Sequence, residues 1–169
     1  MYSPENNPFT YQNTLEGIRT IVDGLTNLAA RGSLIRDINE KLLLGALMAD
    51  KSLSETEMGL HHKCAHVLGG SFGLNHAETH TVLLPYVFFY QWESLTADIK
   101  EDFRDLFSSG KPPRALLNLI TKLGLPSSLK AIGFNKEHSK SAAVQIVQMD
   151  FRNPVPVTKH AVQLLLENA

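Results

Sequence analysis

Apolar residues recur at helical spacing along almost the whole chain. Near the N-terminus they fall three or four positions apart, at Leu15, Ile18, Val22, Leu25 and Leu28. This spacing places them on one face of an α-helix. We expect the helix to begin at Asn13 or Thr14, whose side chains can cap it, and to end at Gly32.

The same period continues through the rest of the chain. It predicts helices over residues 34–49 and from Ser54 to a stop at Gly69 and Gly70, and a further helix that Asn75 and Glu78 open as a capping box. Pro85 is expected to kink or interrupt that helix. More helices are expected over 96–107, 114–123, 136–149 and 158–167, and no segment alternates as a strand. The pattern therefore predicts an all-α fold, a compact bundle of seven or eight helices in a single domain over residues 1–169.

Composition narrows the class of protein. The chain has 169 residues, of which 43% are hydrophobic, enough for one sizeable core, and its net charge of −1 offers no field to attract nucleic acid or an anionic membrane. No apolar run approaches the roughly 20 residues of a membrane span, and the N-terminus lacks a secretory signal pattern. Cys64, the single cysteine, excludes an internal disulfide and is expected to be buried. These features predict a cytoplasmic protein without nucleic-acid or membrane partners.

Five of the seven histidines lie between Gly59 and His80, in the stretch GLHHKCAHVLGGSFGLNHAETH. His62 and His66 are four residues apart on one predicted helix, and His76 and His80 are four apart on the next, so each pair shares a helical face. Because the linking turn is short, we expect the helices to form a hairpin in which the pairs converge. Such imidazoles can ligate a transition metal or transfer protons near neutral pH.

Other residues near the histidines have competing interpretations. His61 lies roughly 100° around the helix from His62. Glu57, four residues before His61, could orient it or form a surface pair, and we favour the surface pair. The run Tyr86, Phe88, Phe89, Tyr90 and Trp92 could line a pocket or fill the core, and only Tyr86 and Tyr90 are expected to have polar roles. The separate His138 and His160 are interpreted as structural or exposed.

The histidine stretch resembles a known family. Its His-His-Lys-x-x-His-x-Leu-Gly-Gly run, followed by His-Ala-Glu-Thr-His-Thr and Leu-Pro, is similar to the maleylacetate reductase branch of the iron-containing alcohol dehydrogenase superfamily. Residues 114–134 and 153–169 resemble the closing helices of that family, and residues 7–21 resemble the segment after the first helix of its helical domain. The resemblance covers essentially the whole chain and only the C-terminal, all-helical domain of the family.

The resemblance implies an oxidoreductase ancestry. Family members bind NAD(P)H in an N-terminal α/β domain, and metal-using relatives hold an ion with an Asp and a His on the first helix of the helical domain and with two histidines that match His62 and His76. Their separation here (76 − 62 = 14) agrees with the family pattern. His66 matches a further active-site histidine, and His80 occupies a position that is Asn in many metal-dependent relatives. Nothing in this sequence matches the α/β domain, the first helix or a G-x-G-x-x-G turn.

Three functional hypotheses follow. The first is a cofactor-independent enzyme of specialised metabolism, in which the histidines act as general acids and bases to isomerise, cyclise or dehydrate a carbonyl-containing small molecule. The second is a helical subunit, pseudo-enzyme or fragment of an NAD(P)H-dependent maleylacetate reductase-like oxidoreductase, and the third is a fragment without activity of its own. In the first hypothesis the catalytic residues are His62, His66, His76 and His80, and the substrate-binding residues are His61, Tyr86 and Tyr90.

The first hypothesis also predicts the cofactors and partners. We expect no NAD(P) and no metal, with zinc or iron at His62 and His76 as the alternative. Helices that face a second domain in the family would leave apolar surface uncovered here. The sequence therefore predicts a homodimer that buries this surface and acts on a small-molecule substrate.

Overall fold

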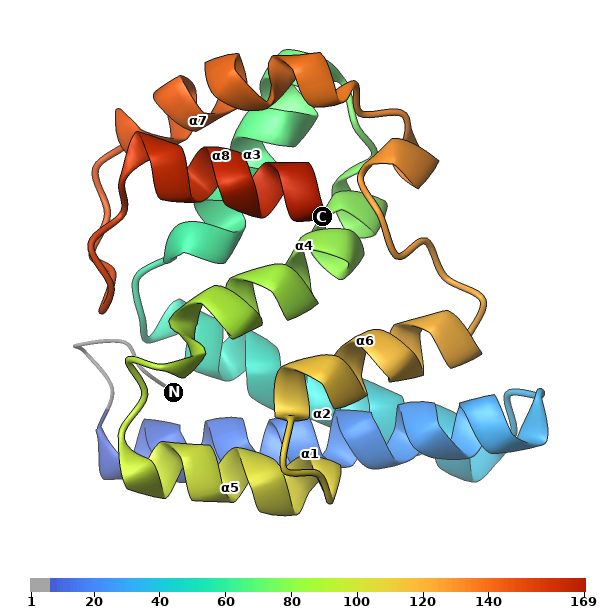
Figure 1. Ribbon diagram of the computed structural model, residues 1–169. Helices are drawn as coiled ribbons and strands as arrows, with labels where there is room; N and C mark the ends of the chain where they lie inside the picture. The colour runs from blue at the N-terminus through green and yellow to red at the C-terminus, as the bar shows by residue number, and fades with distance from the viewer. Residues whose placement is uncertain (1–6) are drawn as a thin grey trace. The chain divides into compact units, whose positions relative to one another are not determined.

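The computed structural model describes residues 7–169, and every regular element in that range is a helix (Figure 1). The all-α prediction is therefore confirmed over the described residues. No helix among them is both long enough and apolar enough to cross a membrane. The elements are α1 (Pro8–Arg31), α2 (Arg36–Ser54), α3 (Leu60–Phe72), α4 (His76–Trp92), α5 (Ala97–Phe107), α6 (Pro112–Lys122), the short 3₁₀ helices η1 (Lys130–Ile132) and η2 (Lys136–His138), α7 (Ser139–Val147) and α8 (Lys159–Asn168).

Packing divides the chain into two compact units. The first unit combines Met1–Glu57 with Leu95–Leu123 and contains α1, α2, α5 and α6, and the second combines Met58–Ser94 with Gly124–Ala169 and contains α3, α4, α7 and α8. Each unit is therefore built from two stretches that are distant in the sequence. The prediction of a single domain over residues 1–169 stays a prediction.

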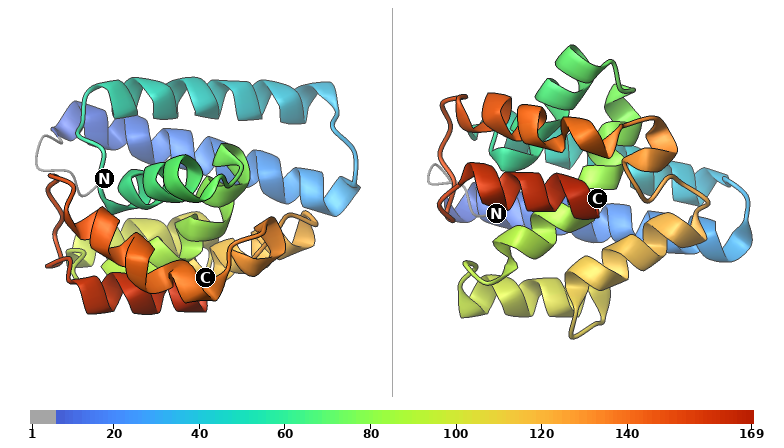
Figure 2. Two further views of the ribbon diagram at one scale, coloured as in Figure 1. Left: turned by 90° about the horizontal axis from the view of Figure 1, so that it is seen from above. Right: turned by 45° about the horizontal axis from the view of Figure 1, so that its top comes forward.

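Helices α1 and α2 lie side by side along most of their length in the first unit (Figure 2). Glycines allow their backbones to come close. A Cβ atom added to Gly45 would lie 2.6 Å from Ile21 Cγ1 and 3.0 Å from the Gly17 carbonyl oxygen. Beyond this contact, the Asn13 side chain donates hydrogen bonds to the Met48 carbonyl at 2.9 Å and to the Ser52 hydroxyl at 2.8 Å. The pairing of α1 with α2 thus combines a close backbone contact with polar bonds between the helices.

The second unit holds the larger apolar core. Its fully buried members include Leu60 and Leu68 of α3, Leu83 of α4 and Ile146 of α7, which pack together with α8. Burial of each such side chain stabilises the fold by about 1.5–3 kcal/mol. This core fixes α3 against α4, and these two helices carry the clustered histidines.

Several helix ends differ from the sequence-based prediction. Helix α1 begins at Pro8 and not at Asn13 or Thr14, because Asn7 caps it by accepting hydrogen bonds from the Phe9 and Thr10 amides at 3.0 Å. Proline in the first helical turn favours this start, because a backbone N–H at that position would have no hydrogen-bond partner within the helix. The predicted end at Gly32 is confirmed, with φ at 68°.

The boundary between α2 and α3 was also wrongly predicted. Ser54 is the last residue of α2, and α3 starts at Leu60. Gly69 and Gly70 lie inside α3, which ends at Gly73 with φ at 70°, a left-handed conformation that glycine adopts without a steric cost. The Asn75 cap is confirmed, because its side chain accepts from the Glu78 amide at 3.1 Å. Pro85 does not interrupt α4, which continues to Trp92.

The buried Gln91 side chain and its partner Asn153 yield a first prediction. Gln91 is 1% exposed, and its Nε2 donates to Oδ1 of Asn153, whose own amide donates to the Val155 carbonyl at 2.7 Å. Replacing Gln91 with Leu removes a donor from the part-buried Asn153 amide, so we expect the free energy of unfolding to fall by about 2 kcal/mol in urea denaturation. The control Gln148→Leu, at an exposed position, should change it by less than about 0.5 kcal/mol. Equal effects of the two substitutions would contradict the prediction.

Candidate functional site

The histidines lie on the hairpin of α3 and α4. Three residues, Gly73 to Asn75, separate the two helices. Along α3 the residues Leu60, Cys64 and Leu68 recur at four-residue spacing and are fully buried. His62 and His66 occupy another side of the same helix, where they are half-buried and exposed respectively. The core contacts of α3 therefore orient His62 and His66 away from the hydrophobic core.

The two histidine pairs converge as the sequence predicts. His62 lies against His80, and His66 lies against His76, so the contacts run antiparallel, as expected in a hairpin. The rings of His66 and His76 are stacked with an interplanar angle of 24°. The distances between ring centroids are 4.4 Å for His76–His80, 4.9 Å for His62–His80, 6.2 Å for His66–His76 and 6.3 Å for His62–His66.

His61 is the fifth member of this histidine cluster. Its ring centroid is 4.8 Å from that of His80, and its Nε2 is 3.0 Å from the His80 carbonyl oxygen. Because a carbonyl oxygen only accepts hydrogen bonds, His61 donates through Nε2–H. Glu57 precedes the first residue of α3, so the four-residue helical spacing assumed for its pair with His61 does not apply there, and the surface pair stays a prediction.

The surroundings of the cluster disfavour protonation of its inner rings. Burial lowers the pKa of His61 to about 4, although its bond to the His80 carbonyl acts in the opposite direction. Burial, followed by the neighbouring His62 and His76 rings, lowers the pKa of His80 to about 4. Burial and then His66 lower the pKa of His62. These three imidazoles are therefore neutral at pH 7, and each can accept or donate a proton.

One polar atom of the cluster has no partner among the described residues. The Nε2 atom of His80 is buried and forms no hydrogen bond. A buried polar atom without a partner is uncommon in folded proteins, because its desolvation is uncompensated. His66 and His76 complete the outer side of the cluster and are exposed. The cluster thus offers neutral inner imidazoles next to outer imidazoles that solvent can reach.

The structure tests only some of the predictions made for residues outside the histidine cluster. The Tyr86 and Tyr90 hydroxyls donate to the carbonyls of Ser127 at 3.2 Å and Pro156 at 2.9 Å, and their substrate-binding roles stay predictions. Lys63, which the sequence reasoning did not single out, adds a positive charge that further lowers the pKa of His62. Its position in the sequence directly after His61 and His62 was the signal that could have pointed to it. His138 and His160 are exposed, as predicted.

Cys64 is fully buried, as predicted, and burial raises the pKa of its thiol to about 12. A thiol reacts as the thiolate, which is scarce and enclosed here. We expect Ellman's reagent at pH 8 to leave Cys64 unmodified in the folded protein and to titrate one thiol per chain in 6 M guanidinium chloride. Rapid modification without denaturant would contradict the burial of this side chain.

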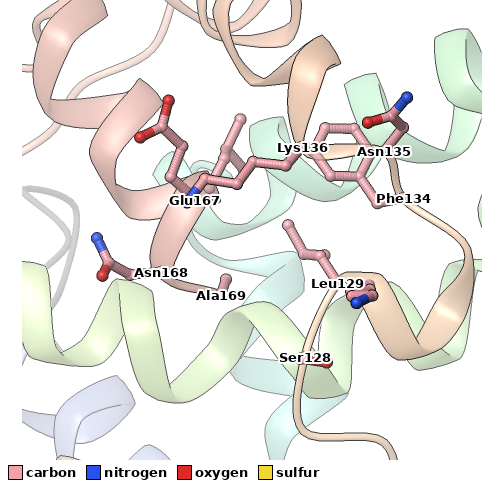
Figure 3. Close-up of a pocket in the computed structure, with 10 residues that line it drawn as sticks. Ser128, Leu129, Phe134, Asn135, Lys136, Glu167, Asn168 and Ala169 are labelled. Atoms are coloured by element: carbon pink, nitrogen blue, oxygen red, sulfur yellow. The ribbon is translucent and has the colours of Figure 1, made fainter.

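A separate hollow of about 550 Å³ lies elsewhere in the second unit (Figure 3). Leu129, Phe134 and Ala169 line it, and Lys136 and Glu167 add charged groups of opposite sign. None of the five cluster histidines contributes to its lining. The hollow and the histidine cluster are therefore distinct features of the second unit.

Comparison with known proteins assigns the chain to a family. The family described as "Fe-containing alcohol dehydrogenase family, C-terminal" matches residues 1–169. The chain belongs to the Fe-containing alcohol dehydrogenase family. It is 37% identical to the maleylacetate reductase of Burkholderia cepacia and 34% identical to maleylacetate reductase 1 of Rhodococcus opacus, in each case over 100% of this chain and 47% of the relative.

Solved structures of Fe-containing alcohol dehydrogenase relatives agree with this assignment. The crystal structure of maleylacetate reductase from Rhizobium sp. strain MTP-10005 superimposes with a TM-score of 0.91 at 32% identity, over 99% of this chain and 47% of that one. The chain thus spans about half the length of the curated relatives it matches. The resemblance noted in the sequence is confirmed, and it is to the C-terminal domain of maleylacetate reductase-like proteins.

The Fe-containing alcohol dehydrogenase family implies a bound metal ion, and the residues of the histidine cluster can be compared with the ligands that such an ion needs. Imidazole nitrogens such as those of His62 and His76 suit iron or zinc, but catalytic zinc sites use three protein ligands. Among the described residues, no three His, Cys, Asp or Glu side chains are placed to hold one ion. The described part of this chain does not by itself provide a complete metal site, and we assign no chemical step to a metal.

Proposed function

We propose that this chain supplies the helical, histidine-bearing half of an NAD(P)H-dependent reductase similar to the maleylacetate reductases. The observation that supports this proposal most strongly is the five-histidine cluster, assembled on a chain that is 37% identical over its whole length to one such reductase. The substrate class would be an unsaturated keto acid such as maleylacetate. NAD(P)H, held by the nucleotide-binding half, would supply a hydride to a substrate carbon.

The role of this chain in that reaction is to bind the substrate and to move a proton. Adding a hydride to a conjugated carbonyl compound leaves negative charge on the substrate, which a proton must neutralise. His66 and His76 are exposed at the outer side of the cluster, so a substrate can reach them, and the neutral rings of His62 and His80 lie directly behind. The outer imidazoles can therefore donate the proton, and the inner ones can hydrogen-bond the substrate oxygens.

The test is reconstitution with the nucleotide-binding half of the Burkholderia cepacia relative. The two polypeptides would be mixed, and NADPH oxidation would be followed by absorbance with maleylacetate present. We expect oxidation that depends on both polypeptides and on the substrate. Absence of turnover in a mixture that forms a stable complex would count against the proposal. Conversion of a carbonyl substrate by this chain alone, without NADPH, would instead support the cofactor-independent hypothesis.

Substitution of His66 gives a more specific prediction. His66→Asn retains a polar side chain but cannot donate a proton as an imidazolium can. In the reconstituted enzyme we expect kcat to fall by about 100-fold, the lower range for loss of a general acid. The control is His160→Asn, at an exposed histidine of α8 outside the cluster, which should leave kcat unchanged. Equal activity of the two variants would exclude His66 from the reaction.

A further inference from the structure

Helix α2 carries an uncovered apolar stripe. Its buried residues Ile38, Gly45 and Ser52 recur every seven positions, and Gly45 contacts α1. On the opposite side of α2, three leucines expose most of their surface to solvent, at 64% for Leu43, 53% for Leu44 and 66% for Leu47. Contiguous exposed apolar residues on a helix indicate an interaction surface.

Charged pairs lie at both ends of this leucine stripe. Toward the N-terminus of α2, the Arg36 guanidinium bonds to Glu40 at 2.7 Å. Toward the C-terminus, the Lys51 ammonium lies 3.3 Å from Glu55. Each pair joins residues four positions apart, and the positive residue comes first in both. Glu40 and Lys51 follow the same helical face as the leucines, since they lie three or four residues from Leu43, Leu44 or Leu47.

We propose that α2 packs against α2 of a second copy of this chain, antiparallel and related by a two-fold axis. In an antiparallel pair centred between Gly45 and Ala46, opposing residue numbers sum to 91. This register places Leu44 opposite Leu47 of the second copy and Glu40 opposite Lys51. The apolar residues therefore meet at the centre, and opposite charges meet at both ends.

The charges also select this arrangement over a parallel one. A parallel, in-register pair would bring each Glu40 against its counterpart and each Lys51 against its counterpart, which is repulsive. The antiparallel pair avoids both clashes. It is isologous, because the same surface is used by both copies, and it closes as a dimer without leaving the stripe free for further association.

The area of the leucine stripe sets the expected affinity of the dimer. A helix of 19 residues is about 28 Å long. One helix pair of this length buries less than the roughly 1,200 Å² typical of stable specific interfaces, so the dimer should be weak. We expect a dissociation constant in the micromolar range, measurable by sedimentation equilibrium of the full chain between about 2 and 200 µM.

The first test replaces a leucine in the stripe. Leu47→Glu places a charge at the centre of the interface, and we expect the dimer dissociation constant to rise at least about tenfold. The matched control is Leu164→Glu, because Leu164 of α8 is also exposed, at 44%, but lies in the second unit. The Leu164→Glu variant should dimerise as the wild type does. Circular dichroism would establish that both variants retain the helical content of the wild type.

Charge reversal tests the antiparallel register itself. Glu40→Lys and Lys51→Glu each introduce two like-charge contacts into the two-fold dimer, and each should weaken it about tenfold. The double variant restores opposite charges across the interface, so its dissociation constant should return to within about threefold of the wild-type value. Recovery in the double variant is not expected if the dimer forms through another surface.

Three outcomes would overturn the proposal: a wild-type chain that is monomeric at 200 µM, a dimer insensitive to Leu47→Glu, or a double variant as weak as the single variants. The first would show that the stripe does not associate in solution, and the other two would show that the dimer does not form through this antiparallel contact. Because sedimentation requires no catalytic assay, its result is independent of the proposed reductase function.

Discussion

Gly45→Ala is expected to lower the free energy of unfolding by about 3 kcal/mol. The added methyl group would lie 2.6 Å from Ile21 Cγ1, 3.0 Å from the Gly17 carbonyl oxygen and 3.1 Å from the Ile21 amide nitrogen. The Ile21 side chain can rotate away from the methyl group, but the two backbone atoms can move only if the helices separate. Widening the gap between α1 and α2 would reduce packing along the pair and strain the bonds from Asn13 to Met48 and Ser52.

The measurement is urea denaturation followed by circular dichroism, with Gly70→Ala as the matched control. Gly70 is also a helical glycine, but a Cβ atom there would meet no atom within 4 Å. Alanine has the higher helix propensity, so we expect Gly70→Ala to be neutral or to stabilise the protein by up to about 1 kcal/mol. A cost below about 0.5 kcal/mol for Gly45→Ala would show that α1 and α2 do not pack this closely.

Acidification from pH 7 to pH 4 is expected to destabilise the fold through the histidine cluster. The pKa of His61 and of His80 is about 4 in the folded chain, below the value of about 6.5 for an unfolded histidine. Between these values the unfolded chain binds more protons, so the unfolding free energy falls as the pH decreases through this range. His61 is the more enclosed of the two, and its shift corresponds to about 3 kcal/mol.

The variant His61→Gln isolates this effect. A glutamine amide can donate to the His80 carbonyl but does not titrate, so the variant should lose less stability than the wild type between pH 6.5 and 4. Protonation of Glu55, whose pKa is lowered by its bond from Thr10, destabilises both proteins at the acidic end of this range and cancels in the difference. Parallel stability curves for the two proteins would contradict the lowered pKa of His61.

The sequence predicted the elements whose causes are local. Asn75 caps α4 as predicted, and α5 and α8 begin one residue after the predicted starts, at which Thr96 and Thr158 cap them, because a cap depends on residues within one helical turn. The convergence of the histidine pairs followed from four-residue spacing on each side of a short turn. Helical spacing and turn length together leave little freedom in a hairpin, so these parts of the candidate site could be derived from the sequence without the tertiary structure.

The sequence-based errors concern helix ends, where more than one residue could cap the helix. Thr10 breaks the apolar pattern, so the start of α1 was placed too late. In the structure Thr10 is 1% exposed and donates to Glu55, 45 positions away. Gly69 and Gly70 resembled a helix stop, but α3 continues to Phe72 and ends at Gly73. Helix propensity alone could not separate these alternatives, because it is weak relative to packing.

What the sequence by itself determined is the all-helical class, the family and the shared faces of the two histidine pairs. These depend on the identity and spacing of residues near one another in the chain. Only the tertiary structure placed His61 on the His80 carbonyl, brought Gly45 against Gly17 and left the leucines of α2 uncovered. It also decided that the inner imidazoles are neutral, because a pKa depends on burial and on neighbouring groups that only the packed fold brings together.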